Sequence, residues 1–143
     1  MAEYKSKHGI VSRPPYELYM SFADMRNFLR FLPADKQEGV TADYDTLKAT
    51  IQGFPIGVKI TERTPYSRII LWDDGAPFHF NVIAHFDHES YNATDFWLEV
   101  DADLNFMMKA MLGNKIQEAL DKAVDGLVSV SQGKAPQFPS DLG

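Results

Sequence analysis

The densest group of side chains that could bind a metal ion is the stretch "HFDHE", which contains His85, Asp87, His88 and Glu89. Imidazoles and carboxylates at such short spacing are ligands that zinc accepts. However, the alternation of the preceding residues places His85 on the solvent face of a strand and His88 in the turn beyond it. No second group of ligands stands out elsewhere. We therefore predict surface histidines and no bound metal.

The acidic residues do not form a catalytic pair either. Glu99, Asp101 and Asp103 share one face of an expected strand, whereas a general acid and a general base need contrasting environments that separate their pKa values. The sequence also lacks a G-x-S-x-G motif and a phosphate-binding glycine loop. Consequently we assign no catalytic residue and no cofactor, and the sequence leaves open whether the protein is an enzyme.

Composition narrows the class of protein and of partner. The 143 residues fit one domain, and the net charge of −6 with scattered basic residues argues against nucleic acid as a partner. No apolar run reaches the roughly 20 residues that a membrane-spanning helix needs. The N-terminal residues lack a secretory signal and the chain has no cysteine, so we expect a cytoplasmic protein without disulfides. A homodimer is compatible with these features, which do not decide the oligomeric state.

The order of elements follows from the changes in apolar spacing. Residues 3–13 predict a strand, and two short helices follow over 14–24 and 25–33, the second capped by Asp24. Alternating apolar residues then predict strands within 39–44, 46–54, 55–63, 67–75, 77–86 and 94–103. Because the connections are short and turn-like, these strands should form an antiparallel meander with one apolar face.

The last strand runs directly into a helix. Up to Asp103 the apolar residues alternate, and from Leu104 onward they recur every three or four residues, which predicts a helix from about Asn105 to Ser131. Its apolar stripe is expected to comprise Leu104, Met108, Leu112, Ile116, Ala119, Ala123 and Leu127. A sheet with one apolar face needs a cover, and this helix is the one element long enough to supply it. The sheet should therefore curl around it.

This arrangement resembles the helix-grip fold of the START-related (SRPBCC) superfamily, which includes polyketide cyclases and lipid-transfer domains. The opening "IVSRPPYELYMSFADMRNFLRFLP" is similar to a first strand that feeds a helix with a buried aromatic residue, and "TDFWLEVDADLNFMMKAMLGNKIQEALDKAVDGL" looks like the closing strand and helix. The resemblance covers residues 3–131, which form a single domain, and leaves 132–143 as a flexible tail. It implies an α+β fold in which a curved antiparallel sheet of six to seven strands wraps around the long C-terminal helix.

The resemblance also implies a cavity between the sheet and the first half of the long helix. Met107, Met108 and Met111 fall in that half, and methionine is flexible enough to form an adaptable pocket wall. Alternatively, these methionines fill a solid core. The full set of expected pocket residues is Tyr44, Trp72, Phe80, Phe96, Met107, Met108 and Met111.

Three functions remain open. The first is non-enzymatic binding or transport of a small hydrophobic ligand, such as a lipid or an aromatic metabolite, because the inner sheet face is almost entirely apolar. The second is a cyclase- or aromatase-like reaction in the same cavity, for which Tyr44, His8, Arg68 or Trp72 would have to supply the polar groups. The third is a protein with a closed core that binds partners through a surface such as that around Trp97.

Overall fold

The computed structural model describes residues 2–31, 34–51 and 53–133. Two short strands, β1 (Ala2–Lys5) and β2 (Gly9–Val11), precede three short helices, α1 (Pro15–Phe22), α2 (Arg26–Phe31) and α3 (Ala34–Gln37). Six further strands follow: β3 (Thr41–Ala42), β4 (Thr46–Ile51), β5 (Phe54–Thr64), β6 (Arg68–Asp73), β7 (Phe80–Ser90) and β8 (Ala93–Ala102). The chain then enters the long helix α4 (Phe106–Ser131). Residues 134–143, most of the predicted tail, lie outside the described residues.

The strands form one antiparallel sheet in the order β1-β8-β7-β6-β5-β4-β3, with β2 also paired to β8. This confirms the predicted meander. The sheet has eight strands rather than six or seven, partly because the predicted first strand is broken between β1 and β2. At the break, the Ser6 hydroxyl accepts a hydrogen bond from the amide of Leu98, where a continuous strand would present a backbone carbonyl. The helix α3 is a third short helix where two were expected.

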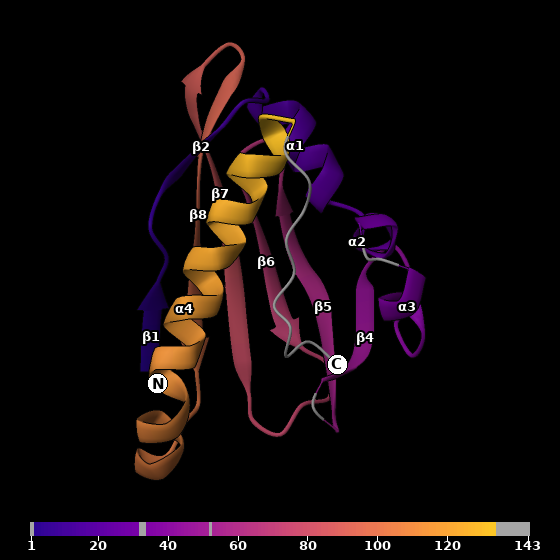
Figure 1. Ribbon diagram of the computed structural model, residues 1–143, viewed down its shortest axis with the longest axis vertical. Coiled ribbons are helices and arrows are strands. Elements are labelled where there is room, and N and C mark those ends of the chain that lie inside the picture. The colour runs from indigo at the N-terminus through magenta and orange to yellow at the C-terminus, as the bar shows by residue number, and fades with distance from the viewer. Residues whose placement is uncertain (1, 32–33, 52, 134–143) are drawn as a thin grey trace.

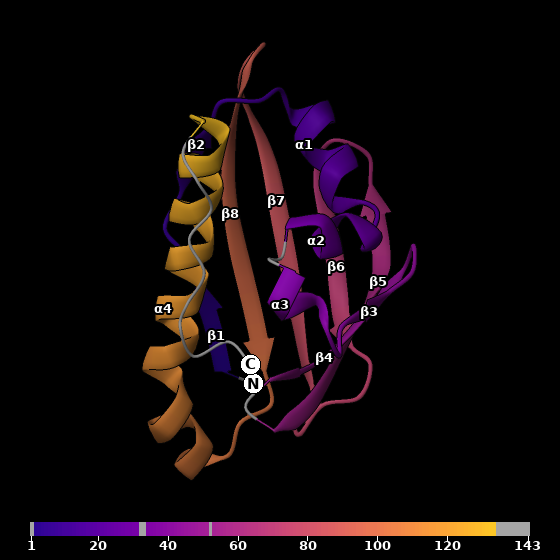
Figure 2. The ribbon, with the colours of Figure 1, turned by 45° about the vertical axis from the view of Figure 1, so that its right-hand side comes forward.

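The four helices of the described residues lie on the same face of the sheet, called here the inner face (Figure 1). The helix α1 packs on β6, β7 and β8, and α2 lies beside β3. The helix α4 stands over the opposite side of that face, along β1, β2 and β8, so that β7 and β8 are seen between the two groups of helices in Figure 2. None of the helices in the described ranges is both long and apolar enough to cross a membrane.

The long helix begins where the sequence predicts. Asn105 is its N-cap, and the Asn105 side chain accepts a hydrogen bond from the amide of Met108 at 2.8 Å. The predicted apolar stripe is wrong in part, because Ala119 and Ala123 are exposed whereas Leu120 and Val124 are buried. The row that faces the sheet continues by four residues from Ile116 to Leu120 and Val124, so the predicted three-residue step from Ile116 to Ala119 does not occur.

Polar contacts fix α4 to the edge of the sheet. The Gln117 amide donates to the backbone carbonyl of Lys5, and the Lys7 amide donates to Asp121 at 2.7 Å. The Lys7 ammonium also lies 2.8 Å from a carboxylate oxygen of Asp125. Gln117 and Asp121, which lie outside the predicted apolar stripe, therefore hold the helix against the strands. As a result α4 rests on the N-terminal edge of the sheet rather than over its centre.

Candidate ligand-binding site on the inner face of the sheet

The pairing of the strands determines which side chains share the inner face. Leu71 of β6 pairs with Val82 of β7, and Val82 pairs in turn with Val100 of β8. Leu47 and Val58 make the corresponding pair between β4 and β5. Since side chains alternate along each strand, the inner face is a continuous apolar surface beneath the helices.

The apolar side chains of this face are not buried equally. Beneath α1, α2 and the C-terminal half of α4, a large cluster has a closed centre of eleven buried side chains, with eight partly buried ones packed around it. Ile69, Phe86 and Phe96 in this closed cluster are almost inaccessible to solvent. A second cluster lies beneath the middle of α4, and only Val100, Ala102 and Leu120 in it are buried. The residues packed around those three are partly exposed: Tyr4, Phe78, Phe80, Val82, Leu98, Leu104 and Ile116. The inner face is therefore apolar but incompletely covered at the end where α4 begins.

A hollow of about 350 Å³ opens at this end, between the start of α4 and the loop that joins β6 to β7. Phe78 and Met108 supply its apolar walls, and His79, Asp103 and Asn105 supply its polar ones. The Asp103 amide donates to the carbonyl of His79 at 2.8 Å, which ties the β8–α4 junction to the loop. The volume of this hollow is at the lower end of the range for small-molecule sites.

Asp73 is a charged residue on the inner face that the sequence analysis did not identify. Its side chain is 9% exposed, and its two oxygens accept hydrogen bonds from the Phe80 amide at 3.0 Å and from Nδ1 of His79 at 3.2 Å. The spacing Ile69, Leu71, Asp73 places it on the apolar side of β6, and this alternation could have revealed it.

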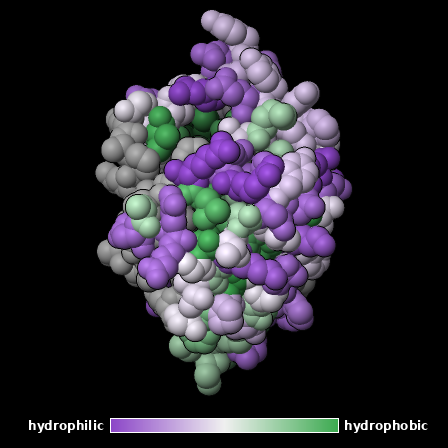
Figure 3. All heavy atoms as spheres, turned by 90° about the vertical axis from the view of Figure 1, so that its right-hand side faces the viewer, coloured by the Kyte–Doolittle hydropathy of each residue, from purple (hydrophilic) through white to green (hydrophobic). Residues whose placement is uncertain are grey.

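Of the predicted pocket residues, Phe80 and Met108 lie near this incompletely covered end. Phe80 is packed against the second cluster, and Met108 lines the hollow. Phe96 is also on the inner face but belongs to the closed cluster. On the side of the molecule that carries α2, α3 and β5, the surface has hydrophobic patches among strongly hydrophilic residues (Figure 3).

The structure does not bring the other four predicted residues to this space. Met107 and Met111 are 70% and 67% exposed, whereas Met108 is partly buried. Trp72 pairs with Lys59 and Asn81 on the outer face of the sheet, opposite to its neighbour Leu71. Tyr44 is exposed at the β3–β4 turn.

The Arg63 guanidinium covers the ring of Tyr44 at 4.0 Å from its centroid. This guanidinium also donates to the carbonyls of Ala23 and Tyr44 and to a carboxylate oxygen of Asp45 at 2.7 Å. It thereby joins the α1–α2 connection and the β3–β4 turn to β5. Tyr44 is thus part of a structural clamp near the short helices.

The histidines of the predicted "HFDHE" group do not converge. His88 is exposed, whereas His85 is only 17% exposed, and its Nε2 donates to a carboxylate oxygen of Glu99 at 2.8 Å. The prediction of an exposed His85 is therefore wrong, since its ring stacks on Trp97 at 3.9 Å between centroids. His8 stacks on the same indole at 4.8 Å.

Trp97 is consequently half-buried between two imidazoles, and its indole N–H donates to Asp87 at 2.9 Å. Both faces and the donor of this indole are occupied within the chain, which weakens its interpretation as an interface anchor. Among the described residues, no group of three or more histidine, cysteine and acidic side chains is arranged to hold a metal ion.

Comparison with solved structures identifies the class of fold. The chain aligns over 97% of its length with 99% of a protein from Thermobifida fusca, at a TM-score of 0.70 and 11% identity. It covers 98% of a START superfamily protein from Mycobacterium smegmatis at a TM-score of 0.59 and 13% identity, using 87% of this chain. No family model and no curated protein matches the sequence.

A third match is to the di-domain ARO/CYC protein BexL of the BE-7585A biosynthetic pathway, at a TM-score of 0.71 and 14% identity. Here 93% of this chain aligns with 47% of the BexL chain. Together these matches show that the protein has a helix-grip fold, as the order of its elements predicts. At such low identity the likeness establishes the fold alone.

Proposed function

We propose that the protein binds a small hydrophobic molecule on the inner face of the sheet, beneath the first half of α4. The observation that carries the proposal is the uneven closure of the inner face. Eleven of its apolar side chains are buried toward the α1 end, against three in the second cluster, where Phe80, Val82 and Ile116 remain partly exposed. Contact between water and apolar side chains grouped around one space costs free energy, and an apolar ligand bound among these side chains would remove that contact.

The hollow beside the β6–β7 loop lies between this space and solvent, and Met108 forms part of its wall. A thioether can adapt its rotamers to ligands of different shape, which suits a wall at an entrance. The ligand class supported by these groups is an aliphatic or aromatic molecule with few polar atoms. Beside Phe80, polar groups are supplied by Asp73, which accepts a hydrogen bond from the Phe80 amide, and by His79, which lines the hollow.

A cyclase- or aromatase-like activity is the second candidate, and the Asp73–His79 contact is the observation that favours it. A carboxylate held 3.2 Å from an imidazole could move a proton at the edge of an apolar site. A product formed from an aromatic polyketide analogue by the native protein, and lost in His79→Gln, would support this reading over binding alone. His79 is well exposed, so this substitution should not disturb the fold.

Native mass spectrometry of the purified protein tests the binding proposal directly. We expect a chain that carries a non-covalent small molecule, or that takes up one molecule per chain from a mixture of medium-chain aliphatic and aromatic compounds. The matched variants are Met108→Trp, which places a large ring in the hollow, and Met107→Trp, which places the same ring on the exposed side of the helix. Absence of any adduct in the native chain would contradict the proposal.

A further inference from the structure

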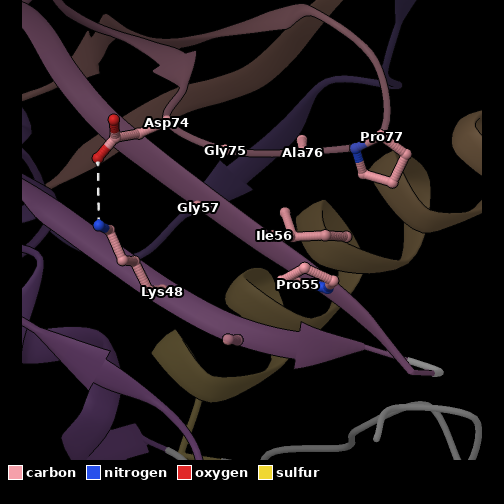
Figure 4. Close-up of a pocket in the computed structure, with 9 residues that line it drawn as sticks. Lys48, Pro55, Ile56, Gly57, Asp74, Gly75, Ala76 and Pro77 are labelled. Carbon is pink, nitrogen blue, oxygen red and sulfur yellow. Dashed lines mark ion pairs between the residues drawn. The ribbon is translucent and has the colours of Figure 1, made fainter.

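A second hollow, of about 470 Å³, lies at the rim of the sheet where β4 ends and β5 begins. It is bounded by these strands and by the loop that joins β6 to β7, and Figure 4 shows its lining residues. We call it the rim hollow. Neither Phe80 nor Met108 borders it, and it shares only Ala76 and Pro77 with the hollow beside Met108.

The rim hollow has a charged end and an apolar end. Pro55 and Ile56 from β5 face Ala76 and Pro77 of the loop at one end, and Lys48 and Asp74 lie at the other (Figure 4). The Lys48 ammonium is 3.9 Å from the Asp74 carboxylate, and both side chains remain substantially open to solvent. Such a long and exposed ion pair contributes little to stability, so its two charges are available to a ligand.

Backbone hydrogen bonds hold the shape of the rim hollow. The Gly57 amide donates to Gly75, and the Asp74 amide donates back to Gly57, each at 2.7 Å. A side chain at Gly57 would collide with the Asp74 carbonyl, so glycine is required for this close approach. The loop and β5 are therefore fixed at the separation that leaves the hollow open.

The charges select the head group of an amphipathic ligand. An anionic head placed at Lys48 would be repelled by Asp74, and a cationic head placed at Asp74 would be repelled by Lys48. A head that carries both charges can separate the loose pair and satisfy each member. We propose that the rim hollow binds an amphipathic zwitterion, with its acidic group at Lys48, its ammonium group at Asp74 and its apolar part against Pro55, Ile56 and Pro77.

Isothermal titration with a matched series of ligands tests this proposal. The probes are dodecyl-N,N-dimethylglycine, dodecanoate and dodecyltrimethylammonium, each below its micelle concentration. They share one tail and differ in head charge. We expect the zwitterion to bind about tenfold more tightly than either singly charged probe, as two weak ion pairs would give. Dodecylphosphocholine has the same tail and a lipid head group. Comparison of its affinity with that of dodecyl-N,N-dimethylglycine distinguishes a phosphate from a carboxylate zwitterion as the preferred ligand. Failure of both zwitterions to bind would overturn the proposal.

Charge-reversal variants identify the site. Lys48→Glu and Asp74→Lys should each weaken binding of the zwitterion about fivefold and favour the cationic and the anionic probe, respectively. The double variant Lys48→Glu/Asp74→Lys should restore zwitterion binding to within about twofold, because the head can reverse. The matched control is Lys59→Glu, an exposed lysine on β5 that does not border the hollow. Equal affinities in Lys48→Glu and the native chain would refute the assignment. Failure of the inner-face proposal leaves these results unaffected, because Lys48 and Asp74, whose charges the variants reverse, border the rim hollow and not the hollow beside Met108.

Discussion

Replacement of Gly9 by alanine should disturb the contact between α4 and the edge of the sheet. A methyl group at this position would lie 2.6 Å from Cγ1 of Val124 and 2.7 Å from Cγ2 of Val128. Both distances are too short for carbon atoms, and the β-branched valines cannot rotate away freely. Overpacking of this kind costs about 1–3 kcal/mol, and the lower entropy of the unfolded alanine chain returns about 0.4–1 kcal/mol. We expect a net loss of about 0.5–2 kcal/mol in the free energy of unfolding.

Urea unfolding followed by circular dichroism measures this loss, and two variants make the measurement specific. Gly126 lies in α4, the helix that carries Val124 and Val128, and no atom lies near a methyl group added there. Gly126→Ala should therefore be neutral or stabilise the protein by up to about 1 kcal/mol. In a Val124→Ala background the added methyl at residue 9 gains space, and Gly9→Ala should then cost clearly less. The packing argument is refuted if Gly9→Ala is as stable as the native chain, or if its cost is the same in both backgrounds.

Two further perturbations test the clamps of the short helices and turns. Arg63→Lys keeps the charge but cannot reproduce the hydrogen bonds to Ala23, Tyr44 and Asp45, and we expect thermal unfolding to show a loss of about 1–3 kcal/mol; an unchanged melting temperature would contradict the clamp. Hydrogen bonds from the Thr46 hydroxyl and from backbone amides hold the pKa of Asp43 below its usual range. Because the folded pKa is depressed, this stabilisation is present above the unfolded pKa of about 3.9 and is lost as the pH falls through the folded value. Urea titrations between about pH 5 and 2 should therefore show that the free energy of unfolding falls less steeply with pH in Asp43→Asn than in the native chain. Identical slopes in the two proteins would contradict the role given to Asp43.

The fold was largely predictable because its signals are periodic and local. The switch from alternation to helical spacing at Asp103 located the β8–α4 junction, and the Asn105 cap agrees with it. The break at Ser6 between β1 and β2 was not predictable, since it depends on a hydrogen bond with Leu98, which is distant in the sequence. Likewise, which apolar row of α4 is buried depends on how the helix sits on β1 and β2. This placement follows from tertiary contacts of Lys7 and Gln117 and not from periodicity.

The site was predictable only in part for the same reason. Alternation placed Phe80 and Phe96 on the inner face, but it could not show that Phe96 lies in the closed cluster and Phe80 near the incompletely covered end. Trp72 was assigned to the pocket although its strand is apolar on both faces, so its side could not be read from pattern. The rim hollow depends on the close approach of Gly57 to the β6–β7 loop, which no local sequence signal encodes.

The most direct test of the inner-face site is a titration of the native protein with an environment-sensitive naphthalene dye, compared with Met108→Trp and Met107→Trp. The tryptophan at 108 would fill the hollow that leads to the partly exposed apolar side chains, whereas the tryptophan at 107 would project from the exposed side of α4. We expect saturable binding of one dye per native chain, a loss of at least about tenfold in affinity for Met108→Trp, and native affinity for Met107→Trp, with unchanged circular dichroism in all three. Absence of saturable binding by the native chain, or equal affinity in Met108→Trp and Met107→Trp, would contradict a ligand site beneath the first half of α4.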